Sequence, residues 1–189
     1  LLIAYTDTIH TVSEGDTLTA LSERYGVPLL LLLRNNPTIA ARTPAADGSI
    51  GLFPGESIII RFSDQTASVR NPISVIGYAY PNIDRGILRQ TLPFLTYLSI
   101  FTYGFTFEGE LITVDDTELI SIARSYGTAP ILLFSTLGPD GQFNNNLSSA
   151  LFASPELQER IINALIQTMQ EKGYYSLDID FEFVPPEER

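Results

Sequence analysis

Three carboxylates stand two residues apart near the end of the sequence: Asp178, Asp180 and Glu182. In a β-strand, residues at this spacing project from one face, about 6.6 Å apart. The residues between them are apolar. Neighbouring carboxylates that share protons or receive hydrogen bonds are suited to acid–base chemistry. The other interpretation is an edge strand whose acidic face is solvated, and the spacing alone leaves both open.

The composition removes most other catalytic arrangements. The chain has 189 residues, no cysteine and a single histidine, His10. Disulfides, thiolate zinc sites and cysteine nucleophiles are therefore excluded, and a Ser–His–Asp triad or a multi-histidine metal centre is disfavoured. Further oxygen ligands for a hard cation are not evident either. We predict hydrolytic chemistry by carboxylates, with no metal and no cofactor.

The charge balance limits the class of partner. Acidic residues number 22 against 11 basic ones, which gives a net charge of −11. Nucleic-acid binding depends on clustered cations, and the longest apolar run, residues 27–33, is too short to cross a bilayer. We expect a neutral polymer as partner, with no nucleic acid and no membrane.

A polar stretch at 63–72 divides the chain into two segments with different patterns. Strand and helix signals in the first segment predict the order strand, helix, helix, strand. Turn and stop residues such as Gly26 and Pro37 separate them. The expected elements are a strand at 9–12, helices at 17–25 and from 28 to 33, and a strand at 57–61. The expected domains are 1–8, 9–62, the linker 63–72, and 73–189.

The first segment resembles a LysM module. The resemblance rests on Ser-Glu-Gly-Asp-Thr-Leu at 13–18, Arg-Tyr-Gly-Val at 24–27, Asn36, and Leu-Phe-Pro-Gly-Glu-Ser-Ile at 52–58. LysM modules bind N-acetylglucosamine-containing glycans between two loops. The alternative to glycan contact is that Asp16 or Thr17 only caps a helix and Pro37 only ends one. Residues 1–4 also resemble the last strand of a preceding LysM copy. The implied glycan contacts are Gly15, Asp16, Thr17 and Leu18 on one lip, and Asn36, Pro37, Thr38 and Ile39 on the other.

The second segment alternates between apolar strands and amphipathic helices, which is typical of βα repeats around a parallel sheet. A complete (β/α)8 barrel takes about 250 residues, and 73–189 is about half of that. The fold class is therefore α/β, a small βααβ LysM domain plus the first half of a TIM barrel. Expected strands are 73–80, 97–103, 129–135 and 174–184, with a hairpin at 105–112. Expected helices are 85–94, one opened by a capping box of Asp115 and Glu118, and one from Ser154-Pro155 to Gly173 with Leu157, Ile161, Ile162, Leu165, Ile166 and Met169 on one apolar face.

The run Lys-Gly-Tyr-Tyr-Ser-Leu-Asp-Ile-Asp-Phe-Glu at 172–182 resembles the fourth-strand signature of glycoside hydrolase family 18, Asp-Gly-x-Asp-x-Asp-x-Glu. The three carboxylates match its last three acidic positions, whereas Tyr175 and Ser176 replace its first Asp and its Gly. With a LysM module upstream, the chain is most similar to the spore cortex-lytic, germination-associated branch of that family.

The resemblance implies retaining hydrolysis assisted by the substrate, an exception to the two-carboxylate scheme. Glu182 would be the general acid and then the base, and Asp180 would hold the 2-acetamido group whose oxygen attacks the anomeric carbon. Asp178 would share a proton with Asp180. Strand ends on the catalytic face suggest Tyr78, Tyr103 and Ser135 as substrate-binding residues, with simple packing as the alternative.

We therefore expect a bacterial glycosidase at the cell wall or spore, extracellular, that hydrolyses peptidoglycan, in particular cortex fragments. A chitinase and a non-catalytic wall-binding protein are the alternatives. Members of the family also use a tyrosine and a tryptophan from later strands, and this chain has no tryptophan. We interpret the sequence as an incomplete, inactive copy.

Overall fold

The computed structural model describes residues 5–63, 74–182 and 184–186. Contacts divide these residues into two units. The first contains the described residues up to Val75 together with Ile83–Leu95, and the second contains Ile76–Asn82 and the described residues from Thr96 onward. Residues 1–4 and most of the expected linker at 63–72 lie outside the described residues.

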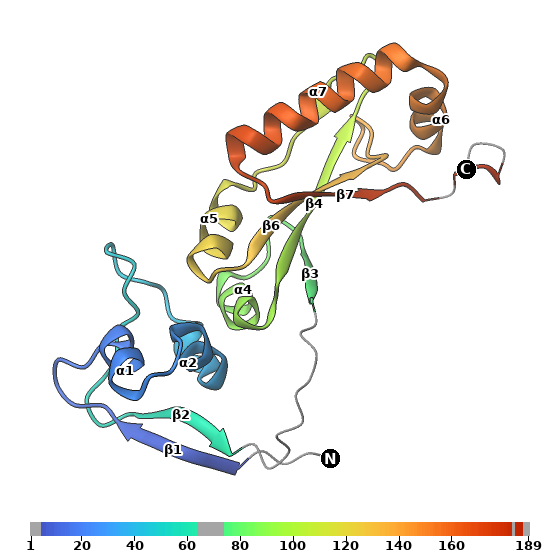
Figure 1. Ribbon diagram of the computed structural model, residues 1–189. Helices are drawn as coiled ribbons and strands as arrows, with labels where there is room; N and C mark the ends of the chain where they lie inside the picture. The colour runs from blue at the N-terminus through green and yellow to red at the C-terminus, as the bar shows by residue number, and fades with distance from the viewer. Residues whose placement is uncertain (1–4, 64–73, 183, 187–189) are drawn as a thin grey trace. The chain divides into compact units, whose positions relative to one another are not determined.

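The first unit is built on an antiparallel pair of strands, β1 and β2 (Figure 1). The helices α1, α2 and α3 connect the two strands in chain order, so the predicted order of elements is confirmed with one short helix added. Strand β1 begins at Tyr5, four residues earlier than expected. The bounds are β1 Tyr5–Thr11, α1 Leu18–Tyr25, α2 Leu29–Asn35, α3 Pro37–Ala40 and β2 Ser57–Ser63.

Local signals explain the boundaries of these helices. The Thr17 hydroxyl accepts a hydrogen bond from the Ala20 amide at 3.1 Å and so caps α1. Gly26 ends α1 in the left-handed conformation, with φ of 60°, which costs glycine little. Helix α2 packs against both α1 and β2, and Leu32 of α2 and Ile58 of β2 are fully buried. Helix α4 (Arg85–Thr91) and the 3-10 turn η1 (Leu92–Phe94) pack against α3 and α2 in the same unit.

The second unit contains a parallel sheet whose strands lie in chain order, β3-β4-β6-β7 (Figure 1). Strand β5 pairs with β4 in an antiparallel hairpin. Four parallel strands in sequential order are what the first half of a TIM barrel requires, as predicted. The bounds are β3 Ile76–Ala79, β4 Tyr97–Phe105, β5 Leu111–Ile112, α5 Thr117–Ser125, β6 Ala129–Ser135, α6 Asn145–Ala153, α7 Pro155–Lys172 and β7 Ser176–Asp180.

Several local expectations for this unit were wrong. Helix α6 follows a polar Asn-rich stretch that gave no apolar period, and it was not predicted. Strand β7 ends at Asp180, shorter than the expected 174–184. In α7 only part of the expected apolar face is covered, because Ile162 and Ile166 are about half exposed, at 53% and 48%.

Helix α5 begins one residue later than the expected capping box of Asp115 and Glu118 requires. Asp116 occupies the N-cap position, yet its side chain makes no capping hydrogen bond. The carboxylate is fully buried and instead accepts hydrogen bonds from the hydroxyls of Tyr103 and Tyr174, each at 2.5 Å, and from the Lys172 ammonium at 2.6 Å. This cluster connects β4, the start of α5, the end of α7 and the approach to β7.

Candidate active site

Strand β7 carries Asp178 and Asp180, two of the three carboxylates of the expected site, at the carboxyl end of the sheet. It pairs with β6 so that Asp178 stands beside Leu133 and Asp180 beside Ser135. Because paired residues of parallel strands share a face, Asp178 and Asp180 project on the side of Ser135. Glu182 lies two residues beyond the end of the strand and is exposed.

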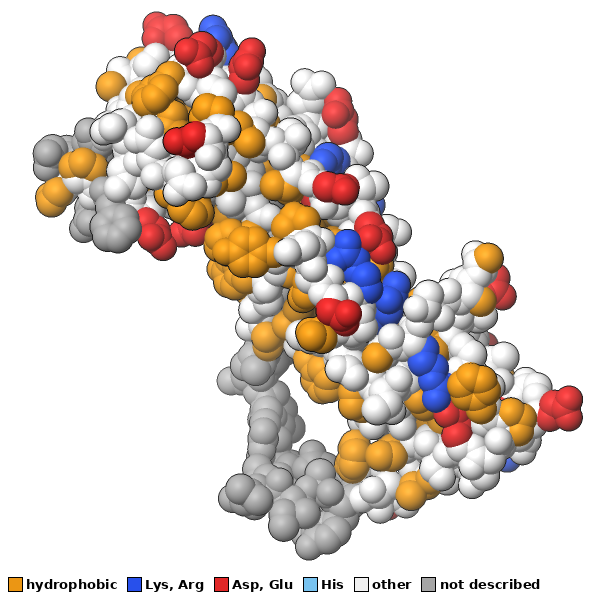
Figure 2. All heavy atoms as spheres, turned by 180° about the vertical axis from the view of Figure 1, so that it is seen from behind, with side chains coloured by type: hydrophobic (Ala, Val, Ile, Leu, Met, Phe, Trp, Pro, Cys, Tyr) orange, Lys and Arg blue, Asp and Glu red, His pale blue; other side chains and the backbone are white. Residues whose placement is uncertain are grey.

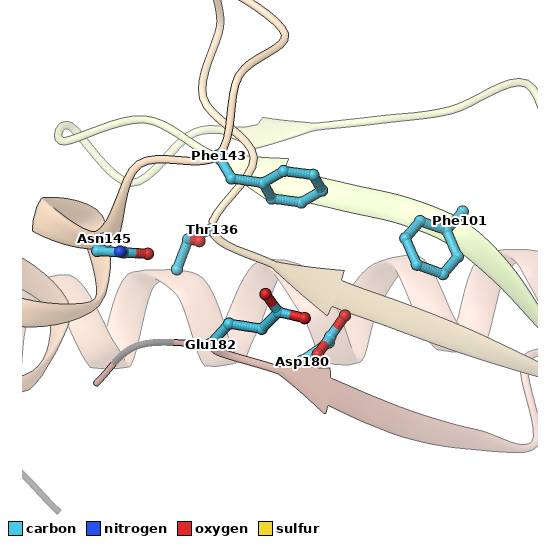
Figure 3. Close-up of a pocket in the computed structure, with 6 residues that line it drawn as sticks. All are labelled: Phe101, Thr136, Phe143, Asn145, Asp180 and Glu182. Carbon is cyan, nitrogen blue, oxygen red and sulfur yellow. The ribbon is translucent and has the colours of Figure 1, made fainter.

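Two pockets adjoin along this acidic face. One, of about 320 Å³, is lined by Asp180 and Glu182 together with residues of β4 and of the chain after β6 (Figure 3). The other, of about 290 Å³, is lined by Asp178, Asp180, Tyr78 and Phe101. The three carboxylates therefore line two neighbouring pockets, and Phe101 and Asp180 belong to both.

Asp178 is the carboxylate with the best defined neighbours. Its Oδ2 accepts a hydrogen bond from the Ser99 hydroxyl of β4 at 3.1 Å. Tyr78 of β3 lies nearby, and its pKa is raised by burial and by the adjacent Asp178 carboxylate. Tyr78 remains 57% exposed and makes an edge contact with Phe101 at 6.2 Å between ring centroids. The position predicted for Tyr78 at the rim of the site agrees with this arrangement.

The other two expected sugar contacts are less accessible. Ser135 is fully buried, and its Oγ accepts a hydrogen bond from the Thr102 hydroxyl at 2.9 Å. Tyr103 is fully buried too, and its hydroxyl donates to Asp116 on the far side of the sheet from the carboxylates. The register of β4 against β6 shifts between Ile100 and Tyr103. The prediction assumed that side chains alternate regularly along the strand, so it placed Tyr103 on the wrong face. Tyr103 therefore has a packing role, and we remove it from the proposed site.

The two expected LysM lips contain exposed and buried residues. Asn36 is buried: its amide nitrogen donates to the carbonyls of Leu32 and Ile59, each at 2.8 Å, and its Oδ1 accepts from the Ile59 amide. This side chain is therefore occupied in joining α2 to β2, and glycan contact by Asn36 is not supported. The exposed members are Gly15, Thr17, Pro37 and Thr38, whereas Leu18 and Ile39 belong to the core.

Asp16, another member of the first lip, is held by a small polar cluster. Its Oδ2 lies 2.8 Å from the Nε2 of buried His10 and accepts the Ser13 amide at 2.7 Å. The Nδ1 of His10 lies 3.0 Å from the Tyr25 hydroxyl. The hydrogen bond with His10 lowers the pKa of Asp16 below its usual value. Asp16 thus shapes the loop, and its carboxylate is already occupied.

Sequence reasoning missed Thr136, Phe143 and Asn145, which line the 320 Å³ pocket. Phe143 lies opposite Glu182, with Phe101 at one end of the hollow and Thr136 and Asn145 at the other (Figure 3). Phe143 and Asn145 come from the connection between β6 and α6 and from the first turn of α6. The only sequence signal was their position after the carboxyl end of a parallel strand, where sites of such sheets form.

The residues 136–144 form a tight β6–α6 loop. The Gly138 amide donates to the Gln142 carbonyl at 2.8 Å, and the Asn144 amide donates to the Thr136 carbonyl at 2.9 Å. The end of β4 holds the loop as well, because the Phe105 amide donates to the Leu137 carbonyl at 3.1 Å. The loop is thereby held together internally and attached to the end of β4.

Gly104 allows this close approach of strand and loop. A Cβ atom at Gly104 would lie 2.0 Å from the Leu137 carbonyl oxygen. We expect Gly104→Ala to displace the loop and to lower the free energy of unfolding by about 1–3 kcal/mol, the usual cost of overpacking. Thermal and urea unfolding measure this loss. Gly51→Ala is the matched control, since a Cβ there meets nothing within 4 Å; equal stability of the two variants would contradict the proposed contact.

The remaining surface offers few other functional features. Among the described residues, His, Asp and Glu side chains nowhere form a group of three or more that could hold a metal ion. None of the described helices is both long and apolar enough to cross a membrane. Figure 2 shows Lys and Arg side chains interspersed with Asp, Glu and hydrophobic side chains on the visible face.

Comparisons with known proteins identify one known domain and several similar proteins. The model of the LysM domain matches residues 10–61. The chain is 32% identical over 102 residues to the cortical fragment-lytic enzyme of Bacillus cereus, which is 53% of this chain and 24% of that enzyme. The crystal structure of the Bacillus cereus spore cortex-lytic enzyme SleL is similar over 96% of this chain and 41% of its own, with 27% identity and a TM-score of 0.60.

The fold of the second unit is shared more widely. A class V chitinase from Pseudomonas fluorescens Pf-5 matches with a TM-score of 0.52 at 22% identity, over 62% of this chain and 37% of that one. The chain thus spans less than half the length of each of these relatives. It consists of a LysM domain followed by part of an α/β barrel that is similar to the cortex-lytic enzyme SleL and, in fold, to class V chitinases.

Proposed function

We propose that this chain is part of a glycosidase that hydrolyses N-acetylglucosamine-containing glycan, with peptidoglycan of the spore cortex as the substrate. The observation that carries the proposal is the placement of Asp178, Asp180 and Glu182 along one pocketed face at the carboxyl end of the sheet. The names of the relatives, which include cortical fragment-lytic enzymes, support the same activity.

The proposed mechanism is substrate-assisted and retaining. Glu182, exposed at the mouth of the hollow, protonates the glycosidic oxygen as the bond to the leaving sugar breaks. Asp180 holds the acetamido group, whose carbonyl oxygen forms the new bond to the anomeric carbon. Asp178, oriented by Ser99, shares a proton with Asp180 and so limits repulsion between the two carboxylates. Glu182 then takes a proton from the incoming water, which restores the acid.

The four strands described here leave the barrel open, and we expect residues 1–189 alone to be inactive. The test is therefore the release of reducing ends by the protein encoded by the complete reading frame, with cortex peptidoglycan and chitin oligomers as substrates. Release from cortex fragments supports the proposal, and release from chitin alone supports the alternative chitinase. A folded protein that binds both polymers and cleaves neither would instead be a wall-binding protein.

We also propose that the LysM domain retains the protein on the polymer, at the bacterial cell wall or the spore. Pro37 and Thr38 on one lip and Gly15 on the other are exposed and so accessible to a glycan. Attachment of this kind raises the local concentration of the catalytic part near its substrate.

A charged residue on the LysM lip formed by residues 36–39 should weaken the binding of the protein to the polymer. We expect Thr38→Asp to reduce binding to insoluble chitin about tenfold, because the new carboxylate must lose water on contact with the glycan. Cleavage of short soluble oligomers should be unchanged. Thr6→Asp, in an exposed position of β1, is the control. A co-sedimentation assay measures the binding, and unaltered retention of Thr38→Asp would contradict the lip assignment.

A further inference from the structure

The β6–α6 loop holds an exposed aromatic ring over the acidic face. Phe143 is 61% exposed, although the loop that carries it is fixed by backbone hydrogen bonds and by its bridge to Leu137. A large apolar side chain kept in place and open to solvent beside carboxylates is suited to contact with a ligand that has an apolar surface. Figure 3 shows its ring across the hollow from Glu182.

The rest of the pocket adds polar groups of a particular kind. Asn145, at the start of α6, brings an amide that can both donate and accept hydrogen bonds. Phe101 supplies a second ring, itself held in contact with Tyr80 at 5.0 Å between centroids. Rings and an amide around a hollow of about 320 Å³ match a pyranose unit, which has an apolar face and a polar edge.

The negative charges on the acidic face disfavour binding of an anionic sugar. Among the described residues of the second unit there are three cations, and each of them has a hydrogen-bond partner outside the lining of the pocket. Arg124 donates to the Gly173 carbonyl, Arg160 to the Glu108 carbonyl, and Lys172 to Asp116. The pocket itself contains the carboxylates of Asp180 and Glu182. A carboxylate-bearing sugar would meet like charges here with no described cation to offset them.

We propose that Phe143 and Asn145 form a subsite for an uncharged pyranose on the Glu182 side of the acidic face. The apolar face of the sugar stacks on the Phe143 ring, and the Asn145 amide binds a polar group at the edge of the sugar. The subsite deepens the proposed glycosidase function and rests on it for its place beside the scissile bond. It also predicts a preference for uncharged over carboxylate-bearing sugar units next to Glu182.

The absence of tryptophan from the chain provides a direct test. Phe143→Trp introduces a single indole into the full chain at this exposed position, and its emission reports on this pocket even when the LysM domain also binds sugar. We expect chitotriose to shift the emission to the blue in a saturable manner, and trigalacturonate to have no such effect. Phe107→Trp is the matched control: Phe107 is similarly exposed, at 52%, in the turn before β5, and its emission should not respond.

Two further variants separate this inference from the proposed function. In the protein from the complete reading frame, Phe143→Ala should raise KM about five- to tenfold and leave kcat nearly unchanged. In residues 1–189, the double variant Phe143→Trp/Glu182→Gln should keep the emission shift, because binding of the sugar does not need the proton donor. If Phe143→Trp gives no shift, or the same shift with trigalacturonate, or if Phe143→Ala leaves KM unaltered, the subsite is refuted. The glycosidase assignment would survive this result as long as turnover still depends on Glu182.

Discussion

Replacing Glu182 with glutamine should reduce turnover by about 10²- to 10⁴-fold, the usual contribution of a general acid. Glutamine keeps the size of the side chain but has no proton to give to the departing oxygen. Glu182 is exposed and lies beyond the end of β7, so the substitution should leave folding and polymer binding intact. Release of reducing ends by the complete protein measures the effect.

The leaving group provides a sharper criterion. A nitrophenolate departs without protonation, so the loss in Glu182→Gln should be much smaller for the bond-breaking step of a nitrophenyl glycoside than for a natural oligomer. Asp180→Asn should lose activity on both substrates, because the acetamido group must still be held. Glu159→Gln, on an exposed position of α7, is the matched control. Full activity of Glu182→Gln on natural oligomers would rule out the proposed mechanism.

Removing the buried carboxylate of Asp116 should have the largest effect on stability. Asp116→Ala leaves the Lys172 ammonium and the hydroxyls of Tyr103 and Tyr174 without their shared acceptor. Breaking a buried ion pair in this way costs about 3–5 kcal/mol. Asp115→Ala, at the exposed neighbouring position, should change the free energy of unfolding by less than about 0.5 kcal/mol. Urea unfolding compares the two, and equal stability would contradict a structural role for the cluster.

The same cluster predicts how stability depends on pH. Burial by itself would raise the pKa of Asp116, but the hydrogen bonds from Lys172, Tyr103 and Tyr174 outweigh it and the net pKa is lowered. Its contribution is therefore present above about pH 4, the ordinary range of the group, and is lost as the pH falls through the folded-state pKa.

Ionisation of the tyrosines in this cluster makes stability depend on pH in the alkaline range as well. Burial and the Asp116 carboxylate raise the pKa of Tyr103 to about 12. An unfolded tyrosine loses its proton near pH 10, so the contribution of Tyr103 is present below about pH 10 and is lost as the pH rises toward 12. Urea unfolding between pH 7 and pH 11 should show this decline, and Tyr103→Phe should make it shallower. An identical alkaline profile in Tyr103→Phe would contradict the assignment.

Patterns local in the chain were sufficient for much of the architecture. Helix α7 begins after Ser154, whose Oγ accepts the Leu157 amide at 3.2 Å, and ends at left-handed Gly173, as its capping signals predicted. The spacing of Asp178 and Asp180 placed both on one face of a strand, and the structure agrees. Such signals act within a few residues, so the sequence alone is enough to recognise them.

Contacts between distant segments decided the rest. Asn36 was assigned to a glycan lip, but the backbone of Ile59 in β2 binds its amide. The expected capping box placed the helix cap at Asp115 and assigned no role to Asp116, yet residues of β4 and of the end of α7 bind the Asp116 carboxylate. A buried polar group must find partners, and which partners are available depends on the packing of the whole unit.

The sequence by itself therefore determined the LysM domain, the βα alternation and the spacing of the acidic residues. Only the tertiary structure decided which of the candidate side chains reach the pocket. The register shift in β4 turns Tyr103 away from the carboxylates, and the close approach at Gly104 sets the loop that brings Phe143 over Glu182. Both results depend on backbone contacts between β4 and residues about thirty positions further along the chain, beyond the range of any local pattern.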